Sequence, residues 1–247
     1  ASVRTQLAER IAHLQKTKDA TKFIAYFQAF TNTYAPVSEL KKIYDTITRF
    51  PEIVGISIGT RPDAVDPEKL GLIAAYRDRY DVWIEYGLQS IHDKTLAAIN
   101  RGHTYAAFLD AYRLTKAAGL KVCAHVILGL PGETHADMIA TADALTHLRV
   151  DGVKIHLLHV LKGSQLETLY RAGKVTLLSR DAYVALVCDF LERLSPEIVV
   201  QRLTGEGDAE HHLAPLWALD KMGTIQKIKD ELRRRGSWQG IKSSCHP

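Results

Sequence analysis

Val82-Trp83-Ile84-Glu85-Tyr86 is an apolar stretch of the kind that forms a buried β-strand, and one carboxylate interrupts it before the chain continues as Gly87-Leu88-Gln89-Ser90. Because burying an unpaired carboxylate is very costly, Glu85 needs a cation or several hydrogen-bond donors. Similar stretches begin near residues 23, 54, 121 and 152, and a helical period of apolar residues lies in each gap. Strands that recur about every 30 residues are typical of βα units in a parallel sheet. The spacing predicts an α/β fold, and both a barrel and an open doubly wound sheet fit it.

The apolar periodicity also predicts the individual elements. The predicted strands are residues 23–27, 54–59, 82–86, 121–128, 153–158 and 198–203. The predicted helices are residues 3–14, 38–47, 67–77, 93–99, 105–118, 134–145, 164–172 and 179–193, followed by helical C-terminal material. Ser38, Asp66 and Thr134 are the expected N-caps. Because the chain opens on a helix, we expect a first strand upstream of residue 1.

The sequence has 247 residues, of which 46% are hydrophobic and 24% are charged, and its net charge is +4. This composition is that of a globular protein. No window approaches the roughly 18 consecutive apolar residues of a membrane helix, and the first residues lack the apolar segment of a signal peptide. Cys123, Cys188 and Cys245 lie far apart and form no CxxC pair. This cysteine usage is typical of a reducing compartment, and we expect a cytoplasmic protein.

Unusual residues occur at the carboxyl ends of five predicted strands, where α/β proteins place their chemistry. The stretches are residues 28–33, 59–63, 85–90 and 129–133, and the pair Lys154 and His156. Each alone has a structural explanation, since residues 129–132 read as a turn and Arg61 with Asp63 as a local ion pair. Five such strand ends in succession favour a polar ligand over the carboxyl ends of the strands.

The residues 85–90, together with Asn100-Arg101-Gly102-His103-Thr104, resemble the radical S-adenosylmethionine (SAM) superfamily. The chain is similar to the Elongator catalytic subunit and to oxygen-independent coproporphyrinogen dehydrogenase. Residues 27–33, 59–63, 122–125 and 129–133 narrow the resemblance to the YhcC/YtqA type. The matching motifs occur in order between about residue 3 and residue 205, and the ordered set is far more specific than any single motif.

The resemblance implies a partial (β/α) TIM-type barrel whose first strand and cluster loop are missing from these residues. It implies a barrel core over residues 1–205 and a helical, basic C-terminal extension over residues 206–247. In this superfamily a [4Fe–4S] cluster reductively cleaves SAM, and the resulting radical abstracts hydrogen from a substrate. The electron would come from a donor such as flavodoxin or ferredoxin.

The same resemblance implies a set of cofactor-binding residues. They are Gln28, Thr31, Asn32, Thr60, Arg61, Glu85, Gln89, Arg101, His125, Gly129 and Leu130. Arg101 would pair with the SAM carboxylate, as a guanidinium does well, and Glu85 and Gln89 would hold the ribose and methionine portions. Backbone groups at residues 129–130 would pack against adenine, where glycine permits close approach.

The chain departs from the family pattern at three places. Gln28, Thr31 and Asn32 stand where the family has the Gly-Gly-Glu motif that holds the SAM amino group, and His125 stands where the dehydrogenase has an aspartate. The three cysteines have no cluster-ligand spacing. We therefore assign no metal ligand in this chain and expect the cluster cysteines upstream of residue 1.

Three hypotheses remain for the function. The first is a radical SAM enzyme that acts on RNA, specifically a tRNA nucleoside, with the basic end around Arg233, Arg234 and Arg235 contacting phosphates. The alternative for that basic end is a solvated helix terminus. The second hypothesis is a phosphate-handling aldolase or isomerase with Lys154 as a Schiff-base lysine and residues 205–207 as its phosphate loop. The third is a degenerate barrel that binds SAM or RNA without chemistry.

His211 and His212 are flanked by acidic residues and could suggest a metal site. Because adjacent histidines in a strand point to opposite faces, and a loop fits better, we expect both to be solvated.

Overall fold

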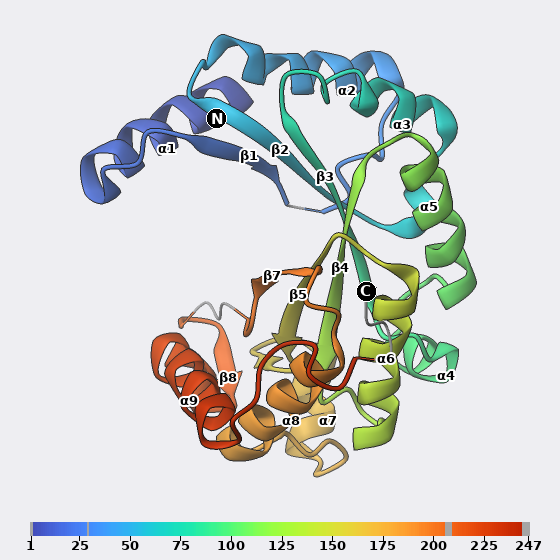
Figure 1. Ribbon diagram of the computed structural model, residues 1–247, viewed down its shortest axis with the longest axis vertical. Coiled ribbons are helices and arrows are strands. Elements are labelled where there is room, and N and C mark those ends of the chain that lie inside the picture. The colour runs from blue at the N-terminus through green and yellow to red at the C-terminus, as the bar shows by residue number, and fades with distance from the viewer. Residues whose placement is uncertain (1, 29, 206–208, 244–247) are drawn as a thin grey trace. The chain divides into compact units, whose positions relative to one another are not determined.

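The computed structural model describes residues 2–28, 30–205 and 209–243 (Figure 1). Cys245 and Gly207 lie outside the described residues. No described helix is long and apolar enough to cross a membrane.

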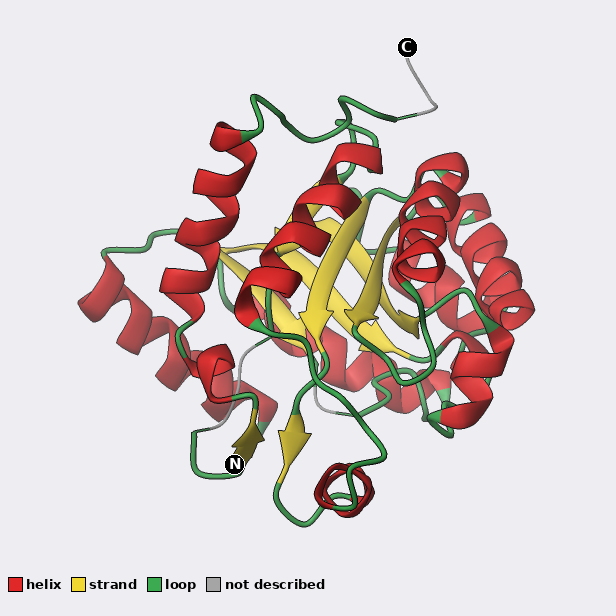
Figure 2. Cartoon of the chain, turned by 90° about the horizontal axis from the view of Figure 1, so that it is seen from below, coloured by secondary structure: helices red, strands yellow, loops and turns green. Residues whose placement is uncertain are grey.

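Six strands form one sheet in the order β1-β2-β3-β4-β5-β7. The pairs β1–β2, β2–β3 and β5–β7 are parallel. The strands are β1 (Phe23–Phe27), β2 (Ile53–Thr60), β3 (Asp81–Gln89), β4 (Lys121–Leu128), β5 (Gly152–Leu157) and β7 (Val199–Arg202). Arrowheads in Figure 2 mark the carboxyl ends of the strands, and loops follow them. The alternation of strand and helix predicted from the sequence is therefore confirmed.

One helix precedes the first strand, one follows the last strand, and the other described helices lie in connections between strands. They are α1 (Val3–Lys18), α2 (Val37–Tyr44), α3 (Pro67–Ala74), α4 (Asp93–Ala98), α5 (Tyr105–Ala117), α6 (His135–Leu148), α7 (Gln165–Arg171), α8 (Arg180–Arg193) and α9 (Lys221–Arg234). Three 3₁₀ turns are η1 (Asp45–Arg49), η2 (Pro62–Ala64) and η3 (Leu216–Leu219).

Two of the three predicted N-caps are confirmed. The Asp66 side chain accepts from the backbone N–H of Lys69, and Thr134 forms a reciprocal capping box with Asp137. The prediction for Ser38 is wrong, because α2 begins one residue earlier, at Val37. Pro36 occupies the N-cap position there and makes no side-chain cap.

A second, antiparallel pair of strands was not predicted from the sequence. It consists of β6 (Val160–Leu161) and β8 (His212–Ala214). His212 lies in β8 and is buried, so the expectation that it is solvated is wrong, whereas His211 is exposed as expected.

The chain divides into two compact units, and the division passes through β3 and β4. The first unit comprises residues 1–87 and 106–123, and the second comprises residues 88–105 and 124–247. The proposed division into a core over residues 1–205 and an extension over residues 206–247 stays a prediction.

The core of the first unit forms around β2 and β3. Ile56, Ile58 and Ile84 are fully buried. Tyr86 of β3 packs edge-on against Phe108 of α5 at 6.0 Å between ring centroids. Burial of these strands on both faces explains their continuous apolar character.

The core of the second unit forms around α8, which packs against α6 and α9. Val187, Cys188 and Phe190 of α8 are fully buried. Figure 1 shows α8 and α9 side by side. Cys188 Sγ lies 3.7 Å from the Ile228 carbonyl oxygen of α9, so this side of α8 contacts the C-terminal helix.

The segment that follows α9 is anchored to α8 by a charged network, which we call the C-terminal clasp. Glu192 exposes only 1% of its surface and accepts from Ser237 Oγ at 2.7 Å and from Lys242 Nζ. Arg235 Nη1 lies 3.4 Å from Glu192 and 2.6 Å from Asp189. Burial alone would raise the pKa of Glu192, but the contacts with Lys242 and Ser237 outweigh it and lower that pKa.

The clasp changes the interpretation of the basic C-terminal end. Arg235 is a half-buried cation held by Asp189 and Glu231, so the expectation of a solvated helix end is wrong for this residue. Arg233 and Arg234 are exposed and pair with Asp230 and Glu231 of their own helix.

We predict that Glu192→Ala lowers the free energy of unfolding by about 2–4 kcal/mol, because it leaves Arg235 without one carboxylate and frees the segment after α9. The matched control is Glu197→Ala, since Glu197 is exposed, and it should change stability by no more than about 0.5 kcal/mol. Urea denaturation followed by circular dichroism measures both. Equal stability of Glu192→Ala and wild type would contradict a stabilising clasp.

Candidate functional site

In the first unit, polar residues at the carboxyl ends of β1 and β2 lie against each other. The Asn32 side-chain nitrogen donates to the carbonyl oxygens of Phe27 and Gly59, both at 3.0 Å. A Cβ at Gly59 would lie 3.2 Å from the Phe27 oxygen, so glycine allows the two strand ends to approach closely. Asn32 thus links the end of β1 to the end of β2 and fixes the loop between β1 and α2.

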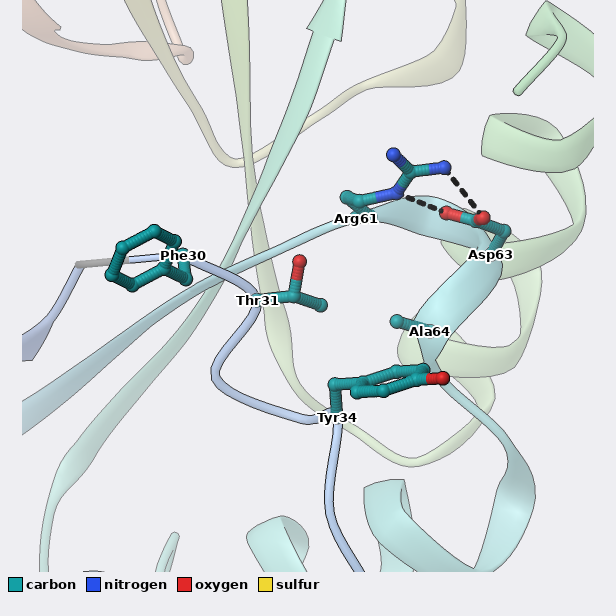
Figure 3. Close-up of a pocket in the computed structure, with 6 residues that line it drawn as sticks. All are labelled: Phe30, Thr31, Tyr34, Arg61, Asp63 and Ala64. Carbon is teal, nitrogen blue, oxygen red and sulfur yellow. Dashed lines mark hydrogen bonds and ion pairs between the residues drawn. The ribbon is translucent and has the colours of Figure 1, made fainter. Parts of the chain in front are cut away.

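The loops after β1 and β2 line a pocket of about 560 Å³ (Figure 3). Its lining residues are Phe30, Thr31, Tyr34, Arg61, Asp63 and Ala64. Arg61 forms a two-pronged ion pair with Asp63 at 2.8 and 2.7 Å, which confirms the local pair expected from the sequence. Phe30 is 98% exposed. The pocket therefore combines aromatic faces with hydroxyl, guanidinium and carboxylate groups.

The other predicted residues on these loops lie differently. Gln28 is exposed directly after β1. Thr60 is buried, and its hydroxyl lies 2.6 Å from that of Thr33, which donates to the Ala64 carbonyl at 2.7 Å. The Thr60 hydroxyl is thus part of the hydrogen bonding that holds the loop after β2.

Glu85 exposes 1% of its surface, in the middle of the sheet. Its carboxylate accepts from Tyr26 Oη of β1 at 2.8 Å and from Ser57 Oγ of β2. The sequence-based requirement for several donors is therefore met by hydroxyls from two neighbouring strands. Neither hydroxyl was predicted, although Ser57 is the one hydroxyl side chain inside the apolar run of β2 and marked the position.

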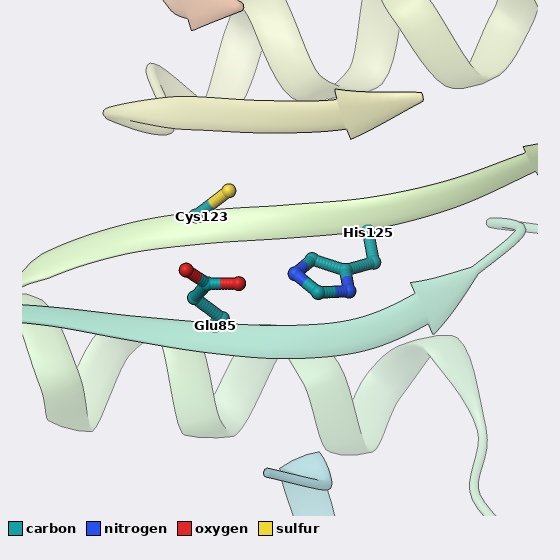
Figure 4. A group of neighbouring side chains, drawn as sticks. All are labelled: Glu85, Cys123 and His125. Carbon is teal, nitrogen blue, oxygen red and sulfur yellow. The ribbon is translucent and has the colours of Figure 1, made fainter. Parts of the chain in front are cut away.

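Cys123 of β4 faces the same region as Glu85 (Figure 4). The Glu85 carboxylate and Cys123 Sγ lie within 4.8 Å of one another. His125 follows two residues after Cys123, so both point to the same face of their strand.

In the second unit, the loop after β3 is tied to the loop after β4. Ser90 Oγ donates to the Glu133 carboxylate and accepts from the backbone N–H of His92 at 3.0 Å. Burial raises the pKa of Glu133, and the hydrogen bond from Ser90 opposes this in part. Gln89, directly before Ser90, has a left-handed backbone with φ of 72°, a conformation that costs free energy in a residue other than glycine.

The remaining predicted residues of the second unit are Arg101, Gly129 and Leu130. Arg101 is half-buried in the loop after α4. Gly129 has φ of 86°, and a Cβ there would lie 3.1 Å from the Leu178 side chain. The structural reason for glycine is therefore its backbone conformation and the contact with Leu178. Leu130 is buried.

The two cysteines that the structure describes do not fit the ligation of a [4Fe–4S] cluster. Cys123 lies inside β4 and Cys188 inside α8, and both are fully buried. Burial raises the pKa of the Cys188 thiol to about 11, which disfavours the thiolate that a metal needs. We assign no cluster ligand among the described residues.

Comparison with known proteins gives two family matches. The Radical SAM superfamily matches residues 3–145, and the Radical_SAM C-terminal domain matches residues 150–234. YtqA of Bacillus subtilis (strain 168) is 43% identical over 226 residues, which are 92% of this chain and 70% of YtqA. YhcC of Escherichia coli (strain K12) is 37% identical over 232 residues, which are 93% of this chain and 75% of YhcC.

A solved structure supports the fold. The archaeal Methanocaldococcus infernus Elp3 with an N-terminus deletion aligns with a TM-score of 0.81 at 17% sequence identity. The alignment covers 96% of this chain and 60% of the Elp3 chain, so this chain spans less than two thirds of that protein.

The sequence-based resemblance is confirmed for the superfamily, for the YhcC/YtqA type and for the Elongator-related core. The fold class, a partial (β/α) barrel, is confirmed as well. These matches favour radical SAM chemistry over an aldolase or isomerase. The individual cofactor-binding residues stay predictions.

We predict that Tyr26→Phe and Ser57→Ala each lower the free energy of unfolding by about 1–3 kcal/mol, because each removes a donor from the buried Glu85 carboxylate. Tyr34→Phe is the control, since the Tyr34 side chain is 84% exposed, and its effect should stay within about 0.5 kcal/mol. Chemical denaturation at pH 7 measures all three. If the two hydroxyl deletions are as mild as the control, Glu85 does not depend on these donors.

Proposed function

Because this chain belongs to the radical SAM superfamily, we propose that it binds SAM and that reductive cleavage of SAM serves to abstract a hydrogen atom from a substrate. The observation that carries the proposal is the succession of polar residues at the carboxyl ends of the strands, within an ordered match to the family. Bound SAM supplies the hydrogen-abstracting radical, and the protein must orient SAM and exclude water.

Within the first unit, the pocket after β1 and β2 has groups that suit a zwitterionic sulfonium cofactor. Thr31 offers a hydroxyl, and Asp63 offers a carboxylate that suits an ammonium group. Arg61 holds this carboxylate in place through its two-pronged ion pair with Asp63. Asn32 acts indirectly, since its side-chain nitrogen already binds two backbone oxygens and holds the loop.

Within the second unit, Arg101 is the proposed partner of the SAM carboxylate, as the family pattern implies. The contact between Ser90 and Glu133 holds the backbone at Gln89, which is the proposed contact for the ribose and methionine portions. The proposed [4Fe–4S] cluster is assigned no ligand in the described chain, and its reduction calls for a donor such as flavodoxin or ferredoxin.

We predict that Arg101→Ala in the full-length protein weakens SAM binding by about 2–5 kcal/mol, because a charged contact with the carboxylate is lost. Arg113→Ala is the matched control, since Arg113 is exposed on α5 and pairs only locally with Asp110. Equilibrium dialysis gives the SAM affinity, and 5′-deoxyadenosine formed under anaerobic reduction reports cleavage.

Unchanged affinity and unchanged cleavage in Arg101→Ala would refute this assignment. If the wild-type protein binds SAM normally but forms no 5′-deoxyadenosine, the result would instead support a module that binds SAM without cleaving it.

We further propose that the substrate is RNA, specifically a tRNA nucleoside. Exposed cations on the last turns of α9, namely Lys229, Arg233 and Arg234, are available to phosphates. Trp238 is 62% exposed close by in the sequence and offers a surface on which an unpaired base can stack. Arg235 is excluded from this role because the C-terminal clasp holds it.

We predict that the triple variant Lys229→Ala/Arg233→Ala/Arg234→Ala binds bulk tRNA more weakly and with a shallower salt dependence, because fewer counterions are released. The slope of log affinity against log salt should fall by up to about 2 for single-stranded contacts. The matched control is Lys41→Ala/Lys42→Ala on α2, which removes exposed charge elsewhere.

Filter binding at several salt concentrations measures the slope. An identical slope for the triple variant and wild type would remove RNA docking from α9.

A further inference from the structure

Four histidines of the second unit form two contacting pairs. His125 of β4 and His156 of β5 have ring centroids 5.5 Å apart. His159, just after β5, stacks on His212 of β8 at 5.6 Å with ring planes 26° apart. The family pattern assigns a role to none of these residues except His125.

His156 has an unsatisfied nitrogen in this cluster. Its Nε2 is buried and has no hydrogen-bond partner among the residues that the structure describes. Buried polar atoms without a partner are rare in native structures and point to a missing ligand or water. His212 Nδ1, in the other pair, is likewise buried without a partner among the described residues. These orphan atoms mark a place where a ligand is expected.

Glycine at position 205 keeps space beside the two histidines of the β5 end. A Cβ on Gly205 would lie 3.8 Å from His156 Nδ1 and 3.8 Å from His159 Nδ1. Both Nδ1 atoms therefore lie beside the Gly205 backbone, and His159 Nδ1 is also 3.2 Å from the Leu157 carbonyl oxygen. A polar group that reaches this point would meet the imidazole edge of His156.

The surroundings of His156 are basic. Burial lowers the pKa of His156 to about 3, and His125, Arg202, Lys154 and His159 lower it further by their charge. Lys154 is buried on β5, and its Cα pairs in register with that of Arg202 on β7. His156 is therefore neutral at pH 7, and Arg202 and Lys154 are among the charged groups that act on it.

We propose that this basic cluster, centred on His156, binds a phosphate group of the substrate. A neutral imidazole donates one N–H to an oxyanion, while Arg202 supplies charge that a phosphate requires. The same cation argues against a metal ion, because it repels one at short range.

The site does not rest on the proposed SAM chemistry, since phosphate binding can be measured without SAM. The proposed site requires a substrate that carries a phosphate group. That group can belong to a free phosphate monoester or to a nucleotide. Failure of the phosphate site would leave the proposal of SAM cleavage standing.

The test follows the ring signals of ¹⁵N-labelled histidine in the protein at pH 7 and constant ionic strength. The probes are inorganic phosphate, adenosine 5′-monophosphate and, as the neutral match, adenosine. We expect saturable shifts of the His156 and His159 signals with both phosphates and none with adenosine. Tighter binding of the monophosphate would indicate a nucleotide source, and equal binding would indicate phosphate recognition alone.

Two variants test the residues. Arg202→Gln and His156→Gln should each weaken phosphate binding about tenfold or more, as loss of a charge-assisted contact does, with His159 as the reporter. His147→Gln, on an exposed part of α6, should bind as wild type does. Circular dichroism checks that each variant is folded.

Absence of saturable shifts with both phosphates would overturn the proposal, and so would equal shifts with adenosine. Undiminished binding in both Arg202→Gln and His156→Gln would overturn it as well.

Discussion

The buried carboxylate of Glu85 is the constraint on which the first unit depends. A carboxylate inside a sheet is tolerated only when donors reach it, and the hydroxyls of Tyr26 and Ser57 do so from β1 and β2. These donors lie 59 and 28 residues away in the chain, so they meet Glu85 only when the parallel register of the three strands is correct. The same register brings the loops after β1 and β2 together, which is where the pocket lies.

The second unit holds a buried carboxylate, Glu192, whose partners are in place, and a half-buried histidine, His156, with one buried ring nitrogen that lacks a partner among the described residues. Glu192 is surrounded by Arg235, Ser237 and Lys242, and every one of these contacts joins α8 to the segment after α9. His156 keeps one ring nitrogen without a partner among the described residues, beside Lys154 and Arg202. A satisfied buried charge stabilises the fold, whereas an unsatisfied polar atom at a strand end leaves binding capacity for a ligand.

Local features were predicted well from the sequence. The strands Phe23–Phe27 and Lys121–Leu128 were predicted with their observed bounds, because each is an apolar run between polar residues. The caps at Asp66 and Thr134 were predicted because a cap needs only the next three residues. The strands β6 and β8 escaped prediction, since two and three residues are too few to show a period. Burial of His212 escaped it too, because that burial depends on pairing with β6 and stacking on His159.

The sequence by itself determined the α/β class, the radical SAM family, the order of the polar strand ends and the need of Glu85 for partners. Apolar periods, caps and ordered motifs are properties of neighbouring residues, so they can be read along the chain. Only the tertiary structure decided that Tyr26 and Ser57 contact Glu85, that Arg235 belongs to a clasp, and that His156 has an unpartnered nitrogen. These contacts join segments far apart in sequence, and strand register and helix packing select them in a way that no local pattern encodes.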